Sequence, residues 1–240
     1  MKGIILAGGT GSRLFPLTKV TNKHLLPVGK LPMILHSVKK LVDANIKDIM
    51  VITGTEHMGD IISLLGSGVG YDCEITYRIQ DEPDGIAGAL SLCKNFACDD
   101  SIVVILGDNI FSNSLSSSIK KFKEIDSSIK CLLNVVRVND PERFGVPTIE
   151  SGKIIKIIEK PDNPDSDYCV TGVYIYDKNV FNFINRLKKS NRGEYEITDV
   201  NNLYIENGHA GYNIFNEWWT DAGTHDSYQT ANRYSFGKIS

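Results

Sequence analysis

The chain has 240 residues, of which 42% are hydrophobic and 23% are charged, the proportions of an ordinary soluble globular protein. This length allows one large α/β domain or two small ones, and it is enough to bury a substantial core. The formal net charge of -3 argues against a nucleic-acid-binding protein, which would carry a basic face. Any phosphate ligand must therefore be bound by a few local cations.

Five cysteines are scattered along the chain without a C-x-x-C pair. Their odd number and their spacing argue against a disulfide framework and a zinc site, and they favour buried thiols in a reducing compartment. The apolar run after Met1 is too short for the core of a signal peptide, and no later stretch could span a bilayer. We therefore expect a cytoplasmic protein with neither a membrane partner nor a nucleic-acid partner.

The first half of the chain alternates strand-like with helix-like segments. Near-continuous apolar runs predict buried strands at 4–7, 49–53 and 102–106. Between them, apolar residues recur at helical spacing over 33–42 and 61–65. This alternation predicts a mostly parallel sheet with helices on both faces.

In the second half, strands follow one another closely. We expect them at 131–138, 146–150, 154–159 and 170–176, with turn signals between them and helices near 180–187, 197–206 and 227–234. No repeat or linker divides the chain, so we predict a single domain, 1–240, with one lobe over about 1–130 and a second over about 131–240. The predicted fold is a Rossmann-like three-layer α/β/α sandwich with a mostly parallel central sheet and a smaller mixed or antiparallel lobe that could cover a second ligand.

A glycine-rich turn, Leu6-Ala7-Gly8-Gly9-Thr10-Gly11-Ser12-Arg13, directly follows the first strand. Glycines let backbone N–H groups approach phosphate oxygens, and Arg13 adds a forked cation. A phosphate-binding loop is the natural inference, although a purely structural glycine turn stays an alternative. The turn is not a P-loop, because no Lys-Ser or Lys-Thr follows it. It is not a dinucleotide fingerprint either, because Leu14 stands where the third glycine belongs.

Several charged residues indicate a functional site only when they are considered together. Asp108 follows the strand at 102–106, at the edge of the sheet where ligands bind, and Asp221 precedes a glycine turn. Two carboxylates converging on one site would suit Mg²⁺, but each alone could equally be a turn former or a helix cap. Taken singly, Lys23 is typical of a solvated surface charge, and Glu159-Lys160 is typical of an exposed pair.

Together these segments resemble the sugar-nucleotide pyrophosphorylases, a family of nucleotidyltransferases. Beyond the glycine-rich turn, the likeness covers 16–18, 22–28, 80–87, 106–109, 144–146, 158–161, 171–174 and 221–225, and so nearly the whole chain. Several motifs in the right order are far more specific than any one of them. The resemblance implies an Mg²⁺-dependent enzyme that joins a sugar 1-phosphate to a nucleoside triphosphate and releases pyrophosphate. The members that it most resembles use dTTP and glucose 1-phosphate.

The resemblance also assigns roles to individual residues. Mg²⁺ would be held by Asp108 and Asp221, and the catalytic set would be Arg13, Lys23, Asp108 and Lys160. The residues expected to bind the nucleotide are Leu6, Gly8, Gly9, Thr10, Gly11, Ser12, Arg13, Gln80, Pro83 and Gly85. The residues expected to bind the sugar phosphate, in the second lobe and at its border, are Asn109, Gly145, Glu159, Lys160 and Val170.

The segment around Gln80 is expected to recognise the base of the nucleotide. A glutamine offers both a donor and an acceptor, which matches the imide edge of thymine or uracil, and Gly85 could present backbone groups to the same edge. The plainer alternative is a polar loop that caps a helix beginning near Ile86. Family members often have glutamine where this chain has Gly88, and tyrosine where it has Phe144.

Other functions stay open at this stage. The same chemistry with UTP is the nearest alternative, because thymine and uracil share one imide edge. A ligand-sensing module without catalysis is a second, since a fold never guarantees a function. An NAD-dependent oxidoreductase is a third, and the broken dinucleotide fingerprint counts against it. Longer family members continue beyond residue 240 with a regulatory site and subunit contacts. For this short form we expect weak or absent allostery, and a homo-oligomer stays open.

Overall fold

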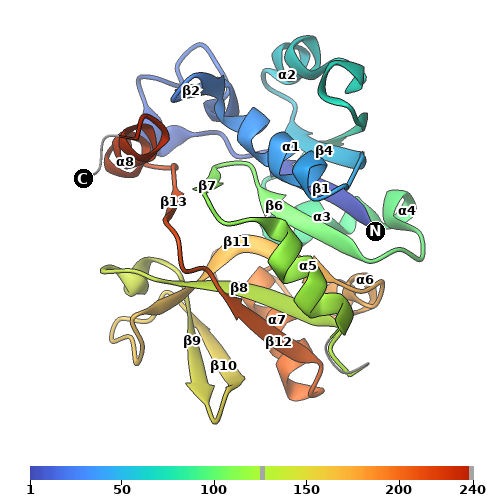
Figure 1. The fold of residues 1–240 in the computed structure, drawn as a ribbon, viewed down its shortest axis with the longest axis vertical. Helices are drawn as coiled ribbons and strands as arrows, with labels where there is room; N and C mark the ends of the chain where they lie inside the picture. Colours follow the sequence, from blue (N-terminus) through green and yellow to red (C-terminus); the bar gives the residue numbers. More distant parts are fainter. Residues whose placement is uncertain (125–127, 238–240) are drawn as a thin grey trace.

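A seven-stranded sheet runs through the molecule from one lobe to the other (Figure 1). The protein is seen in a computed structural model, which describes residues 1–124 and 128–237. In spatial order the strands are β12 (Ala210–Ile214), β8 (Cys131–Arg137), β11 (Tyr168–Tyr176), β6 (Ile102–Leu106), β1 (Lys2–Ala7), β4 (Asp48–Gly54) and β5 (Glu74–Gln80). Strands β6, β1, β4 and β5 are parallel, so their carboxyl ends share one edge.

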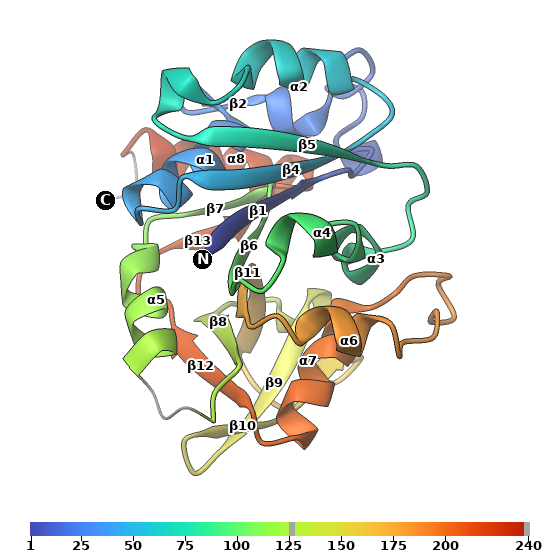
Figure 2. The same cartoon turned by 90° about the vertical axis from the view of Figure 1, so that its right-hand side faces the viewer.

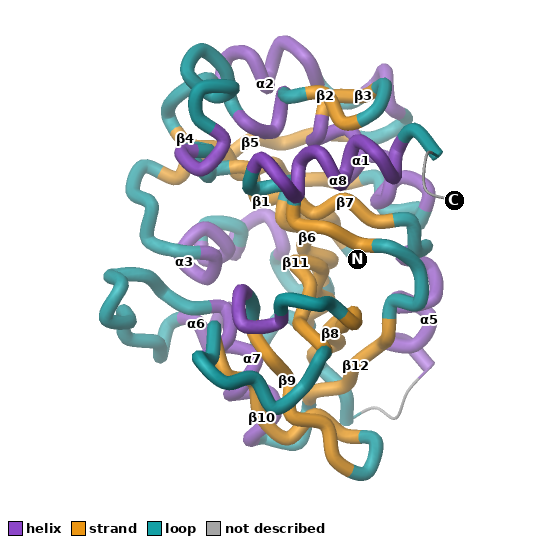
Figure 3. The backbone as a smooth tube through the Cα atoms, turned by 90° about the vertical axis from the view of Figure 1, so that its left-hand side faces the viewer, coloured by secondary structure: helices purple, strands orange, loops and turns teal. Residues whose placement is uncertain are grey.

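Helices cover both faces of this sheet (Figures 2 and 3). One face packs on α1 (Met33–Asp43), α2 (Met58–Leu65) and α5 (Leu115–Glu124). The other packs on α3 (Ile86–Ser91), α4 (Lys94–Ala97), α6 (Val180–Ile184) and α7 (Ile197–Glu206). The apolar runs of the central strands are buried on both sides, as a covered sheet requires. The three-layer fold predicted from the sequence is therefore confirmed.

The four strands expected in the second half are present, and they divide between the main sheet and a separate hairpin. Strands β8 and β11 belong to the main sheet, where β11 pairs antiparallel with both β6 and β8. Only β9 (Gly145–Glu150) and β10 (Lys153–Glu159) form a hairpin of their own. The physical reason is composition: eight of the nine residues of β11 are buried, and such a strand must be covered on both faces.

Short elements complete the edge where the parallel strands end. Strand β7 (Asn109–Phe111) pairs antiparallel with β13 (Trp219–Asp221), which sets Asp221 opposite Asn109. The predicted last helix is α8 (His225–Ser235), which begins with a capping box between Thr224 and Ser227. The remaining short elements are η1 (Ser12–Leu14), η2 (Lys23–Leu25), β2 (Pro27–Val28), β3 (Leu31–Pro32), η3 (Val69–Tyr71) and η4 (Pro141–Arg143). Over residues 1–124 and 128–237, no helix is long and apolar enough to cross a membrane.

Candidate active site

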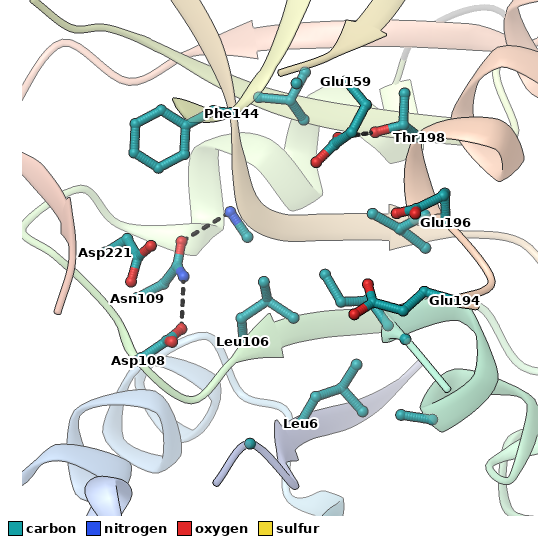
Figure 4. Close-up of a pocket in the computed structure, with 18 of the residues that line it drawn as sticks. Leu6, Leu106, Asp108, Asn109, Phe144, Glu159, Glu194, Glu196, Thr198 and Asp221 are labelled. Atoms are coloured by element: carbon teal, nitrogen blue, oxygen red, sulfur yellow. Dashed lines mark hydrogen bonds between the residues drawn. The ribbon is translucent and has the colours of Figure 1, made fainter. Parts of the chain in front are cut away.

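A pocket of about 420 Å³ lies where the parallel strands end and the second lobe begins (Figure 4). Most of the residues proposed from the sequence line it: Leu6, Gly8, Gly9, Arg13, Lys23, Gln80, Pro83, Gly85, Asp108, Asn109, Gly145, Glu159, Lys160, Val170 and Asp221. Thr10 lines a second pocket, which shares Gly8 and Gly9 with the first. Gly11 and Ser12 line neither of these two pockets.

The glycines of the first turn make room for side chains from other segments. A Cβ atom on Gly9 would lie 3.3 Å from Cε and Nζ of Lys23, and one on Gly8 would lie 2.8 Å from Oε1 of Gln80. Gly11 has a φ of 70°, a conformation that glycine adopts easily. Its carbonyl accepts a hydrogen bond from Oγ1 of Thr18 at 2.8 Å. The turn is thus a bare stretch of backbone against which a cation and an amide lie.

Lys23 and Asp108 form a buried ion pair beneath this turn. Nζ of Lys23 lies 2.5 Å from Oδ2 of Asp108, and the two residues are 8% and 9% exposed. This burial excludes the alternative that Lys23 is a solvated surface charge. Burial alone would raise the pKa of Asp108, but the positive charge of Lys23 and hydrogen bonds from Lys23 and Asn109 hold that pKa well below its usual value. The pair therefore keeps Asp108 ionised.

Asp221 reaches the same place from the far end of the chain (Figure 4). A Cβ atom on Gly223 would lie 2.6 Å from Oδ1 of Asp221, 3.0 Å from Nη2 of Arg13 and 3.5 Å from Oδ2 of Asp108. Burial, followed by the negative charge of Asp108, raises the pKa of Asp221 to about 6. Two carboxylates and an arginine thus surround one glycine, and the carboxylates repel each other.

This arrangement suits a hard divalent cation. Carboxylate oxygens are the ligands that Mg²⁺ prefers, and a cation beside them would relieve the repulsion that raises the pKa of Asp221. Among the residues that the structure describes, no cluster of three or more His, Cys, Asp or Glu could hold a metal ion. An ion at Asp108 and Asp221 would therefore take its other ligands from water and phosphate oxygens, as Mg²⁺ commonly does.

Asn109 fixes the floor of the pocket between the two lobes. Its Nδ2 donates to Oδ1 of Asp108 at 3.1 Å. Its Oδ1 accepts from the backbone N–H of Gly172 at 2.8 Å and from Nε1 of Trp219 at 2.7 Å. The chain has two adjacent tryptophans: Trp219 lines the pocket, whereas Trp218 stacks on the ring of Tyr234. Hydrogen bonds at both ends of the Asn109 amide therefore fix its orientation.

On the second lobe, charged side chains face the pocket from β10 and the segment before α7. Oε2 of Glu159 accepts a hydrogen bond from Oγ1 of Thr198 at 2.6 Å. Lys160 has a φ of 45°, unusual for a residue with a side chain, and its N–H donates to the carbonyl of Phe144 at 2.9 Å. The ammonium of Lys160 lies 3.8 Å from Glu159 and is half exposed, so it is available to an anionic ligand.

Arg192 is a pocket residue that sequence reasoning missed. Its Nη2 lies 2.7 Å from Glu196 and 3.7 Å from both Glu159 and Glu194, so three carboxylates hold it at the pocket. The only signal in the sequence is a polar Arg-Gly-Glu turn after a helix, which is also typical of ordinary surface loops. Arg192 lies close to Glu159 only in the folded protein, and the positions of the two residues in the sequence do not predict this contact.

The hydrogen bonds of His24 and His225 indicate structural roles for both side chains. His24 lines the pocket and is almost fully buried, and its Nδ1 donates to Oδ1 of Asn22 at 2.7 Å. Burial, aided by the positive charge of Lys23, lowers the pKa of His24 to about 3, so its ring is neutral. His225 lies at the start of α8 and bonds through Nε2 to the carbonyl of Phe15 at 2.9 Å, a structural contact.

Comparisons with known proteins identify the family to which the chain belongs. A family model described as nucleotidyl transferase matches residues 2–235. The glucose-1-phosphate thymidylyltransferase of Neisseria meningitidis serogroup A is 41% identical over 235 residues, which are 96% of this chain and 81% of the relative. The enzyme of the same name from Mycobacterium tuberculosis H37Rv is 40% identical over 231 residues, 95% of this chain and 79% of the relative.

Solved structures share the fold. A crystal structure of a Bacillus anthracis protein, provisionally assigned as a glucose-1-phosphate thymidylyltransferase and solved with sucrose, is 56% identical. It superimposes with a TM-score of 0.94, covering 98% of this chain and 95% of the other. A UDP-glucose pyrophosphorylase complexed with UDP-glucose has a TM-score of 0.85 over 99% of both chains, but at 21% identity it shows the fold alone.

Proposed function

Because the chain belongs to the nucleotidyl transferase family, we propose that it condenses dTTP with α-D-glucose 1-phosphate, giving dTDP-glucose and pyrophosphate, with Mg²⁺ as cofactor. The observation that carries this proposal is the convergence of Arg13, Lys23, Asp108 and Asp221, from four separate segments, at one end of a pocket. Relatives at about 40% identity that are named for this activity support the choice of substrates.

The proposed reaction brings two polyanions together. A phosphate oxygen of the sugar phosphate attacks the α-phosphorus of the nucleotide in line, the bond to the β-phosphate oxygen breaks, and pyrophosphate leaves. Arg13 and Lys23 offset the charge on the triphosphate and on the departing pyrophosphate. The bare backbone at Gly8 and Gly9 lets phosphate oxygens approach N–H groups. No covalent nucleophile is needed, so positioning and charge neutralisation supply the catalysis.

Asp108 and Asp221 are the residues that would hold Mg²⁺. When bound, the ion supplies positive charge to phosphate oxygens. The contribution of the chain itself is the charge state of these two groups. Lys23 and Asn109 keep Asp108 ionised, and the β7–β13 pairing holds Asp221 beside it.

Residues of the second lobe would hold the sugar phosphate. Glu159 is directed by Thr198 and offers a carboxylate to sugar hydroxyls. Lys160 and Arg192 bring two cations to the same side of the pocket, where they would meet the phosphate of the sugar 1-phosphate. Gly145 and Val170 line the pocket nearby, where backbone groups can contribute.

The test is Mg²⁺-dependent release of pyrophosphate from α-D-glucose 1-phosphate, with dTTP and UTP run in parallel. We expect release with dTTP favoured, and we expect EDTA to abolish it. A preference for UTP would keep the reaction and change the nucleotide, since Gln80 cannot distinguish thymine from uracil by their imide edges. Silence with both nucleotides across a panel of sugar 1-phosphates would contradict the proposal and favour a ligand-sensing module without catalysis.

A further inference from the structure

The side-chain amide of Gln80 is held in one orientation at the end of β5. Its Nε2 donates to Oδ1 of Asp84 at 2.8 Å and lies 3.4 Å from the carbonyl oxygen of Gly85. Both partners are acceptors, so the flipped amide would set its oxygen against a carboxylate and a carbonyl. That arrangement is repulsive, and the NH₂ group must therefore be the end that faces Asp84. The carbonyl end, Oε1, faces Gly8 in the pocket wall.

The carboxylate of Asp84 occupies space that a side chain at position 88 would fill. A Cβ atom on Gly88 would lie 2.2 Å from Oδ1 of Asp84 and 2.7 Å from its Oδ2. Gly88 is buried within α3, where a glycine is unfavourable by up to about 1 kcal/mol relative to alanine. The helix thus carries an unfavourable residue at a position where a Cβ atom would collide with this carboxylate.

Asp84 is not simply a helix cap. Helix α3 begins after Gly85 and has no hydrogen bond from a side chain at its N-cap. The backbone from Asp84 to Ala87 is held by the segment before α7 instead. The N–H of Tyr195 donates to the carbonyl of Asp84 at 2.8 Å, and the N–H of Ala87 donates to the carbonyl of Tyr195 at 3.2 Å. The carboxylate is therefore presented to Gln80 by a fixed loop.

We propose that Asp84 is a positioning residue that fixes the amide of Gln80 with its oxygen toward the base, and that Gly88 is required to make room for it. This proposal rests on the proposed function, because it takes a pyrimidine nucleotide to be the ligand beside Gln80. Thymine and uracil present N3–H, a donor, to the Oε1 acceptor, whereas cytosine presents a bare N3, an acceptor. The restraint on the amide thus selects against cytosine.

The experiment compares the binding of dTTP and dCTP by calorimetry in four variants, alongside pyrophosphate release. Asp84→Ala removes the acceptor and frees the amide to rotate, so the preference for dTTP over dCTP should fall about tenfold, as for the loss of one hydrogen bond to a charged group. Asp84→Asn keeps an acceptor oxygen and should restore most of the preference. Gly88→Ala should displace the carboxylate and behave like Asp84→Ala. The double variant Asp84→Ala/Gly88→Ala should be no worse than Asp84→Ala alone.

Gly59→Ala is the matched control, because Gly59 lies in α2 with nothing within 4 Å of an added Cβ. It should keep the wild-type ratio of dTTP to dCTP affinity. An unchanged ratio in Asp84→Ala, or equal losses in Asp84→Asn and Asp84→Ala, would overturn the positioning role. If the wild-type protein binds dTTP better than dCTP but releases no pyrophosphate, the proposed reaction is wrong. The positioning role of Asp84 can then still be tested, because it is read from the ratio of the two affinities in the variants. If the wild-type protein binds neither nucleotide, both proposals fail.

Discussion

Lys23 and Asp108 are a buried pair whose charges depend on each other. Lys23 lowers the pKa of Asp108 although burial would raise it, so the carboxylate stays ionised in a place where an isolated one would be unfavourable. Asp221 lacks such a partner at hydrogen-bond distance among the described side chains, and its pKa is raised to about 6. The two carboxylates of the proposed metal site therefore differ in character although they flank one glycine.

Replacing Asp108 with Asn tests the proposed metal site most directly. The substitution keeps the shape of the side chain and removes one charge from the pair of carboxylates. We expect the rate of pyrophosphate release to fall by roughly two orders of magnitude or more, while circular dichroism shows an unchanged fold. Asp167→Asn is the control, since Asp167 pairs on the surface with Arg137. Near-normal turnover in Asp108→Asn would mean that the metal is bound elsewhere.

Arg192 offers a test of the sugar side that leaves the nucleotide side alone. Removing its guanidinium in Arg192→Ala takes one cation from the place where the phosphate of the sugar 1-phosphate would lie. We expect the KM for glucose 1-phosphate to rise about tenfold or more, as for loss of a charge-assisted contact, with little change in the KM for dTTP. The exposed Arg137→Ala serves as the control. Equal rises in both KM values would contradict a role confined to the sugar phosphate.

Single residues also mark the limit of what the sequence predicts. The glycine-rich turn, Asp108 and Asp221 could be proposed because they lie at strand ends or within ordered motifs. Arg192 could not, because its place at the pocket depends on three carboxylates brought together by the fold. Gly88 carries no signal in the sequence, and its meaning emerges only from its distance to Asp84.

At the scale of the secondary-structure elements, the short helical turn η2 places the titratable side chain of His24 in the protein interior. Asn22 begins this turn by accepting hydrogen bonds from both the backbone N–H and Nδ1 of His24. The ring then lies against Gly107, where a Cβ atom would come within 2.7 Å of it. The turn thus buries a neutral imidazole between the ends of β1 and β6.

His24 should make stability depend on pH in a defined window. Its pKa is lowered from 6.5 to about 3 in the folded protein, so as pH falls below 6.5 the unfolded chain gains a proton that the folded protein does not. At pH 5 this lowers the free energy of unfolding by about 2 kcal/mol relative to pH 7.5. The variant His24→Asn can still donate to Asn22 but cannot titrate. In urea unfolding, the stability of the wild-type protein relative to this variant should decrease by that amount between the two pH values. An unchanged difference would contradict the assignment.

The strands were predicted unevenly, for physical reasons. Strands β1, β4 and β6 are apolar runs that are buried on both faces, and periodicity identifies them directly. Strands β5 and β12 lie at the two edges of the sheet and include exposed residues, so they gave no comparable signal. The partners of β8 and β11 could not be predicted either, because pairing across the chain leaves no local trace.

On the scale of the whole molecule, one sheet joins the two lobes. Strand β11 pairs with β6 of the first lobe and with β8 of the second. The two core clusters lie on opposite faces of this sheet, and each contains residues from both lobes. We therefore expect the lobes to unfold together.

The cysteines provide a readout of that cooperativity. Cys98 is exposed, whereas Cys73, Cys93, Cys131 and Cys169 are buried in the two core clusters. Burial also raises the pKa of Cys93 to about 12, which suppresses the reactive thiolate. With a thiol reagent at neutral pH, one thiol should react quickly, and Cys98→Ser should remove that phase. The other four should react together, at the rate of global opening. Two or more fast thiols in the native protein would contradict this.

The pairing of β13 with β7 has a consequence for the time at which the enzyme becomes competent during its synthesis. A ribosome makes the glycine-rich turn, Lys23 and Asp108 long before it reaches Asp221. Until β13 has been made, a growing chain therefore has only one of the two carboxylates that surround Gly223 in the finished protein. The second arrives when β13 pairs with β7. An unfinished chain would thus lack one of the two carboxylates proposed to hold Mg²⁺, and we expect it to release no pyrophosphate.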